Sequence, residues 1–128
     1  MILRCAQRDY SELPGRRSAD PLRAAAPLGF SMRVVSLQDG RRSAHRHPRC
    51  QEVIFVVSGS GRLWEDGVFS GFEQGDCALV EPGVAHATIP NPGSAMELVC
   101  FFPVENVAAA TEELEDIVIS EGQERGTE

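Results

Sequence analysis

The sequence predicts an all-β protein, a sandwich or barrel built from short antiparallel strands. From residue 30 onward, short apolar or alternating stretches recur at a spacing of roughly 8–12 residues, which is typical of strands joined by tight turns. Each stretch ends in a turn signal such as Asp39-Gly40 or Asn91-Pro92-Gly93. The 12 glycines and 8 prolines among 128 residues agree with a chain that turns often. A chain of this length is expected to form one domain.

The N-terminal arm, residues 1–29, is predicted to be irregular apart from one short strand near residues 2–5. Pro14-Gly15, Asp20-Pro21 and Pro27 interrupt any regular pattern there, because proline and glycine disrupt helices and strands. Such an arm is expected to lie over another surface. Whether that surface belongs to its own barrel or to a partner subunit stays open at this point.

Residues 30–104 contain the predicted barrel, and residues 105–128 form an acidic C-terminal segment. Within that segment, residues 111–119 are compatible with either a short helix or an edge strand. Barrel strands are expected at residues 30–38, 52–57, 62–65, 68–72, 76–80, 86–89 and 96–102.

Charge is unevenly distributed along the chain, whose formal net charge is −7. Residues 1–50 carry +6 and residues 51–128 carry −13. The overall acidity argues against nucleic acid as a partner. No apolar run approaches the roughly 18 residues that span a bilayer, and no signal peptide is visible, so we expect no membrane partner and a cytoplasmic location. The four cysteines form no C-x-x-C pair, which predicts free thiols.

The three histidines are spaced so that all could reach one site. His45 and His47 are two residues apart, which aims both imidazoles at the same face of an extended strand. A short loop beginning at Pro48 then lets Glu52 open the next strand facing inward. His86 follows a Pro-Gly turn at the start of another strand. Three imidazoles and a carboxylate form a mixed nitrogen and oxygen site that suits a divalent transition metal.

These segments resemble the two sequence motifs of the cupin family. The first motif corresponds to Gly40, His45, His47, Glu52 and Gly59, and the second to Gly75, Glu81-Pro82-Gly83 and His86. The resemblance implies a small antiparallel jelly-roll barrel with the site inside. It implies that His45, His47, Glu52 and His86 ligate one divalent metal per chain, with iron, manganese, nickel and zinc all open. It also implies a homodimer formed through edge strands and the N-terminal arm.

The cavity lining follows from counting by two along the predicted strands, because alternate residues share a face. Glu97 is expected to face solvent, which turns its neighbours inward, and the first strand is expected to turn Phe30, Met32 and Val34 inward. This lining is mostly apolar and offers no arginine or lysine to hold a phosphate. The predicted substrate pocket consists of Met32, Ile54, Val56, Thr88, Leu98, Cys100 and Phe102.

An apolar pocket beside an open metal site is a typical small-molecule site. The sequence therefore predicts a metal-dependent enzyme acting on an apolar, aromatic or polyketide-like molecule, either an oxygenase or a non-redox isomerase or cyclase. Glu52 is the candidate catalytic residue, as a metal ligand or as a general base. Two alternatives stay open: a small-molecule binding or sensing module without catalysis, and a barrel that the metal only stabilises.

Overall fold

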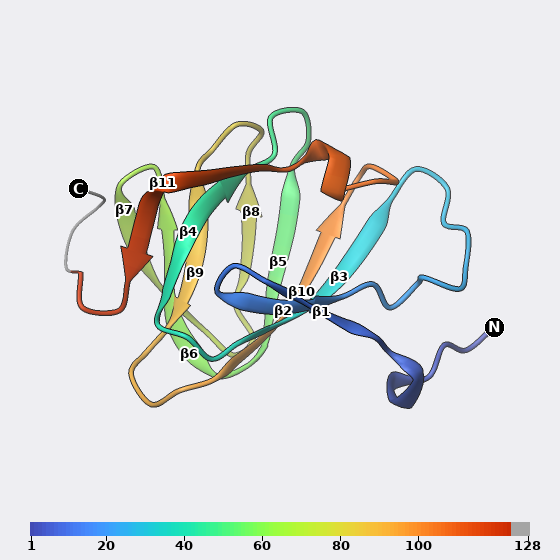
Figure 1. The fold of residues 1–128 in the computed structure, drawn as a ribbon, viewed down its shortest axis with the longest axis horizontal. Coiled ribbons are helices and arrows are strands. Elements are labelled where there is room, and N and C mark those ends of the chain that lie inside the picture. The colour runs from blue at the N-terminus through green and yellow to red at the C-terminus, as the bar shows by residue number, and fades with distance from the viewer. Residues whose placement is uncertain (124–128) are drawn as a thin grey trace.

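The computed structural model describes residues 1–123, which form two antiparallel β-sheets packed face to face (Figure 1). One sheet has six strands in the order β1 (Tyr10–Leu13), β2 (Arg16–Ala19), β3 (Ser31–Leu37), β10 (Met96–Phe102), β5 (Glu52–Ser58) and β8 (Cys77–Val80). The other has five in the order β11 (Glu112–Ser120), β4 (Arg41–Arg46), β9 (His86–Pro90), β6 (Ser60–Glu65) and β7 (Val68–Glu73). Two 3-10 turns, η1 (Cys5–Gln7) and η2 (Ala108–Ala110), complete the described chain. The all-β jelly-roll prediction is confirmed.

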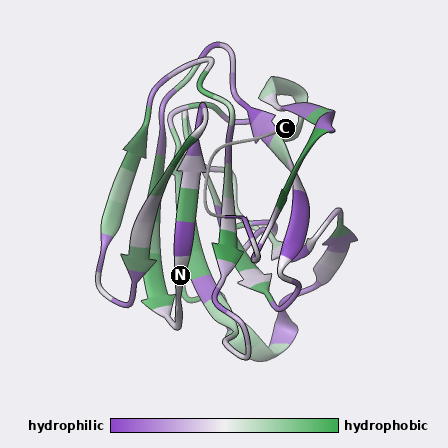
Figure 2. Ribbon diagram, turned by 90° about the vertical axis from the view of Figure 1, so that its left-hand side faces the viewer, coloured by the Kyte–Doolittle hydropathy of each residue, from purple (hydrophilic) through white to green (hydrophobic). Residues whose placement is uncertain are grey.

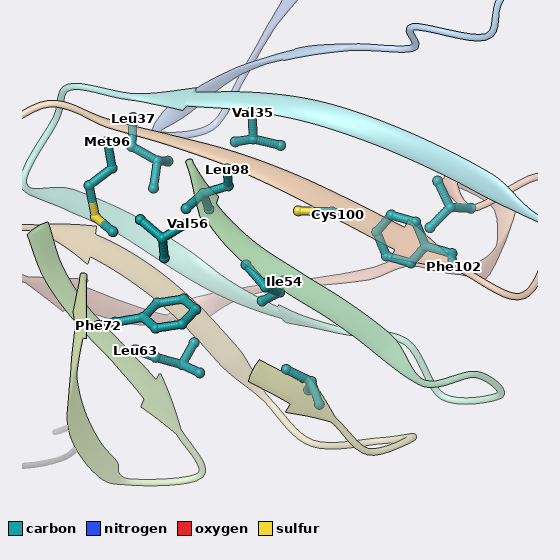
Figure 3. Close-up of a cluster of buried hydrophobic side chains, with 12 residues drawn as sticks. Val35, Leu37, Ile54, Val56, Leu63, Phe72, Met96, Leu98, Cys100 and Phe102 are labelled. Atoms are coloured by element: carbon teal, nitrogen blue, oxygen red, sulfur yellow. The ribbon is translucent and has the colours of Figure 1, made fainter. Parts of the chain in front are cut away.

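The main core lies between the two sheets and follows from the period of two along each strand. On β10, Leu98 and Cys100 are buried while Phe101 is 38% exposed. On β5, Ile54 and Val56 are buried in the same way, and Figure 3 shows them within one cluster that also holds residues of β3 and β10. Burying one face of each sheet removes apolar surface from water and fixes the strand register.

The register of β3 corrects the expected orientation of the first barrel strand. Met32 lies opposite Phe101, and Val35 lies opposite Leu98. Directly opposed residues of antiparallel strands share a face, so Met32 points outward with Phe101 while Val35 points into the core. Phe30 stacks on Phe101 at a centroid distance of 5.8 Å, on that outer side. In Figure 2, several strands change along their length between green hydrophobic segments and white or purple ones.

The arm that the sequence predicts to be irregular contains a β-hairpin. β1 and β2 pair with each other, and β2 continues the six-stranded sheet by pairing with β3, Ser18 opposite Val35. The short strand expected at residues 2–5 is not formed, and the 3-10 turn η1 begins at Cys5 instead. β2 has the sequence Arg-Arg-Ser-Ala, which lacks an apolar alternation, so backbone pairing with β3 holds it in place without a local sequence signal.

The acidic C-terminal segment supplies an edge strand, one of the two alternatives expected there. β11 pairs with β4, and the register shifts between Leu114 and Val118, which marks a bulge. The last five residues of the expected segment, 124–128, lie outside the described residues. No described helix has the length and hydrophobicity needed to cross a bilayer.

Candidate metal centre and cavity

Four side chains from both sheets converge at one end of the interior. His45 lies on β4, directly opposite His86 on β9, and their rings are 4.3 Å apart between centroids. His47 follows β4, and Glu52 opens β5 in the other sheet. One ligand atom from each of the four residues lies within 4.8 Å of the others, and all four residues are buried. Ligands about 2.1 Å from one ion are at most about 4.2 Å apart, so small inward shifts would complete a coordination shell.

Hydrogen bonds outside the group orient two of the imidazoles. His86 donates its Nδ1 proton to the carbonyl oxygen of Val84 at 3.0 Å. The Thr111 hydroxyl donates to the Val107 carbonyl at 2.6 Å, so its oxygen accepts from His47 Nδ1 at 3.1 Å. Both histidines therefore carry their proton on Nδ1 and turn Nε2 inward, the arrangement typical of metal-ligating histidines.

Glu52 lies within hydrogen-bonding distance of two of the imidazoles. Glu52 Oε1 lies 3.0 Å from His47 Nε2 and 2.8 Å from His86 Nε2. Because both Nδ1 atoms already carry protons, these contacts are attractive only if each Nε2 is protonated too or if a cation lies between them. Burial opposes ionisation of Glu52, yet the hydrogen bonds from His47 and His86 outweigh it and lower the pKa of Glu52 to about 2. The residues present therefore fit a divalent metal ion.

His45 differs from the other two histidines. Its Nδ1 accepts from the guanidinium of Arg42 at 3.3 Å. Burial, followed by the nearby His86 and Arg42, lowers the pKa of His45 well below its usual value. His45 is therefore a neutral imidazole with its proton on Nε2, and it would have to free one ring nitrogen to ligate a metal ion.

A cavity of about 280 Å³ opens beside the four residues. Five of the predicted pocket residues line it: Ile54, Thr88, Leu98, Cys100 and Phe102. Met32 does not, because it faces outward, and Arg33 and Val35 represent β3 in the lining instead. Val56 is fully buried in the core and also lies outside the lining. Burial, followed by Glu52, raises the pKa of Cys100 well above its usual value, so this residue stays a neutral thiol.

Sequence reasoning missed the polar part of this lining. Arg16, Arg33 and Arg42 all line the cavity, so the expectation of a wall without arginine is wrong. Arg16 comes from the hairpin, and Val107, Thr111 and Glu113 come from the C-terminal segment. No local pattern could have placed these residues, because both segments reach the cavity only through long-range strand pairing.

This fold and this buried group of three histidines and one glutamate define a cupin-type protein. Residues 33–102 match the family model described as Cupin domain. Because that match covers more than half of the chain, the chain belongs to the cupin family. Among curated proteins, none matches the sequence significantly.

Solved structures with the same fold cover nearly the whole chain. A variant of Streptomyces PAC13 with uridine aligns at 17% identity and a TM-score of 0.76, covering 94% of this chain and 93% of its own. A second structure describes Pac13 as a nucleoside dehydratase and covers 96% of both chains, again at 17% identity and a TM-score of 0.76. The Bacillus subtilis oxalate decarboxylase OxdC aligns at 18% identity and a TM-score of 0.71, covering 87% of this chain and 31% of its own. At these identities the likeness establishes the fold.

Proposed function

We propose that this protein is a metal-dependent enzyme that binds a small molecule in the cavity beside His45, His47, Glu52 and His86. The observation that carries this proposal is the pair of contacts from Glu52 to two imidazoles whose Nδ1 protons are already committed. A divalent metal ion between these atoms would make the contacts attractive without a proton on either Nε2. When bound, such an ion acts as a Lewis acid on a substrate oxygen.

The side chains around the metal group would bind the ligand and supply the acid–base chemistry. Ile54, Leu98 and Phe102 form apolar walls that exclude water and hold the apolar body of a ligand. Glu52 is the candidate catalytic residue, either remaining a ligand or accepting a proton from the substrate. Its low pKa keeps it ionised at neutral pH, which suits a metal ligand, and accepting a proton would require the substrate to change its surroundings.

Two reaction types remain candidates, an oxygenase and a non-redox isomerase or cyclase. The other acid–base groups in the lining are limited: Glu113 is paired with Arg16 at 3.2 Å, and Cys100 is a neutral thiol. A reaction here would therefore depend on the metal and Glu52. Two proteins of the same fold are named as enzymes, a nucleoside dehydratase and an oxalate decarboxylase. This supports catalysis over the alternative of a non-catalytic binding or sensing module.

Metal content is the direct test. Protein purified without added metal should contain about one divalent ion per chain by elemental analysis, and Co²⁺ should restore occupancy after chelation. Glu52→Gln and His86→Ala should lose Co²⁺ binding, seen as loss of its visible absorption bands. Glu97→Gln, on the outer face of β10, is the matched control and should keep them. A wild-type protein that binds neither Co²⁺ nor Fe²⁺, Mn²⁺, Ni²⁺ or Zn²⁺ would overturn the proposal.

Oxygen consumption separates the two reaction types. The Fe²⁺-loaded protein should be incubated with a panel of small aromatic acids and ketones while dissolved oxygen and the proton NMR spectrum are followed. Uptake of oxygen coupled to product formation identifies an oxygenase. Product formation without oxygen uptake identifies the non-redox chemistry. Binding without any product across the panel favours the sensing module.

A further inference from the structure

The cavity contains more positive charge than its lining neutralises. Three arginines line it, Arg16 from β2, Arg33 from β3 and Arg42 from β4. The carboxylates in the lining are Glu52, which belongs to the metal group, and Glu113. A bound divalent metal would increase the positive excess further.

Two of these arginines already have an acidic partner. Arg16 pairs with Glu113 at 3.2 Å and also donates to the Pro14 carbonyl at 3.0 Å. Arg33 lies 3.5 Å from the carboxylate of Asp20. Their charges are balanced within the protein, so neither requires a ligand.

Arg42 has no acidic partner within ion-pair distance among the described residues, although it is the most deeply buried of the three. It is 5% exposed, and its one side-chain hydrogen bond is with His45 Nδ1 at 3.3 Å. A neutral imidazole balances no charge. The Nε atom of Arg42 is buried without any hydrogen-bond partner. A buried charge without an ion-pair partner is strongly destabilising, so its presence here requires an explanation.

The hairpin holds Arg42 in this position. The turn between β1 and β2 lies so close that a Cβ added to Gly15 would be 2.3 Å from Arg42 Cβ. The hairpin therefore closes off the backbone side of Arg42, and Arg42 is one of the residues that line the cavity. Arginine is a cation at neutral pH, and the acidic groups that act on Arg42, Glu113 and Glu52, lie beyond ion-pair distance from it.

We propose that Arg42 binds the carboxylate of a small organic acid whose apolar body lies against Ile54, Leu98 and Phe102. One unpaired guanidinium matches one negative charge, and its planar fork matches the two oxygens of a carboxylate. This inference deepens the proposed function, since the bound acid would lie beside the four-residue metal group. The largely apolar or aromatic substrate predicted from sequence would then carry one carboxylate.

Benzoate and benzamide are suitable probes because they share shape and differ in charge. Their binding should be measured by NMR titration of the metal-free protein, after the chelator has been removed, so that no metal contributes to carboxylate binding. Benzoate should bind about tenfold or more tightly than benzamide, the usual range for a charged hydrogen bond. Arg42→Gln should abolish this preference. Arg62→Gln, which removes an arginine that donates to the Glu121 carbonyl away from the cavity, should retain it.

Several results would overturn the inference. They are equal affinities for benzoate and benzamide in the wild type, survival of the preference in Arg42→Gln, and tighter binding of phenyl phosphate than of benzoate. The melting temperature of Arg42→Gln controls for misfolding. It should equal or exceed that of the wild type, because the variant removes an unpaired buried charge, and the lost benzoate preference then reports on binding. Arg42→Lys provides a second variant, which keeps the charge but not the fork and should bind benzoate more weakly than wild type.

The two proposals fail separately in these experiments. A protein that binds Co²⁺ but shows no benzoate preference retains the metal-dependent function and loses the carboxylate subsite. A protein that prefers benzoate through Arg42 but binds no metal retains the subsite and loses the proposed function.

Discussion

The hydroxyl of Thr111 fixes which nitrogen of His47 faces the metal group. It donates to the Val107 carbonyl and accepts from His47 Nδ1, so it holds the proton on the nitrogen that does not face Glu52. This second contact is made from the C-terminal segment, 64 residues away in the sequence. Residues that support a metal ligand in this way commonly affect affinity almost as much as the ligands themselves.

Thr111→Val therefore tests the metal centre without removing a ligand. The shape of the side chain is kept, but the acceptor for His47 Nδ1 is lost, and we expect Co²⁺ or Zn²⁺ to bind about 10- to 100-fold more weakly. The measurement is a competition titration against a chelating indicator. Thr88→Val makes the same change elsewhere in the lining, at a hydroxyl for which no hydrogen bond to the three histidines is found among the described residues, and should leave affinity unchanged. Equal affinities of Thr111→Val and wild type would show that the tautomer is fixed in another way.

At the scale of single residues, sequence reasoning reaches the four-residue group but not its support. The spacing of His45 and His47 and the turn before Glu52 carry their own geometric information, because strand alternation and tight turns are local rules. No local sequence pattern indicates the roles of Thr111 and Arg42, because each role depends on a contact that only the folded chain creates. The outward orientation of Met32 was also unpredictable, since β3 has apolar residues on both faces and an alternation pattern cannot choose between them.

The elements are held in register by small residues where strands approach each other closely. Gly61 on β6 is buried, and a Cβ added there would lie 2.2 Å from the Ile89 carbonyl oxygen and 2.6 Å from the sulfur of Met96. Gly71 on the neighbouring β7 has no atom within 4 Å of its added Cβ. Neither glycine has a positive φ angle that would itself disfavour alanine. Gly61 and Gly71 therefore differ in the room available for a side chain and not in the sign of their φ angles.

Gly61→Ala is expected to lower the free energy of unfolding by about 1–3 kcal/mol, because the added methyl overlaps backbone atoms that cannot move aside freely. Gly71→Ala should be neutral or stabilising by about 0.4–1 kcal/mol, since alanine reduces the entropy of the unfolded chain. Urea unfolding followed by circular dichroism measures both. A smaller effect at Gly61 than at Gly71 would mean that β6 can shift relative to β9 and β10.

Among the elements, most strands between residues 30 and 102 were predictable, including the edge strands β7 and β8, whereas β4 and the hairpin of β1 and β2 were not expected as strands. Strands β5 to β10 are predicted by the alternation of apolar and polar residues and by turns such as Glu65-Asp66-Gly67. The hairpin of β1 and β2 has polar sequences and exists because β3 offers it an open edge. β11 is ambiguous for the same reason, since its acidic residues fit a helix equally well until β4 is in place.

On the scale of the whole molecule, the outer face of the six-stranded sheet is unusually apolar. Large hydrophobic side chains are exposed there on three adjacent strands: Phe101 is 38% exposed, Phe55 42% and Leu79 54%. Contiguous exposed apolar patches on soluble proteins commonly mark interaction sites. The homodimer expected from sequence stays a prediction. This face is a better candidate for it than the N-terminal arm, because the arm's hairpin is already paired within its own sheet.

Phe55→Glu should therefore shift the protein toward monomer in light scattering at micromolar concentration. A glutamate at this position would place a charge in the centre of a self-complementary interface, where each copy would face the charge of the other. Val68→Glu introduces the same charge at a residue 64% exposed on β7, in the opposite sheet, and should leave the oligomeric state unchanged. A wild-type monomer across this concentration range would contradict the dimer. A dimer that persists in Phe55→Glu would place its interface at another surface, with the free edges of β8 and β7 as the next positions to substitute.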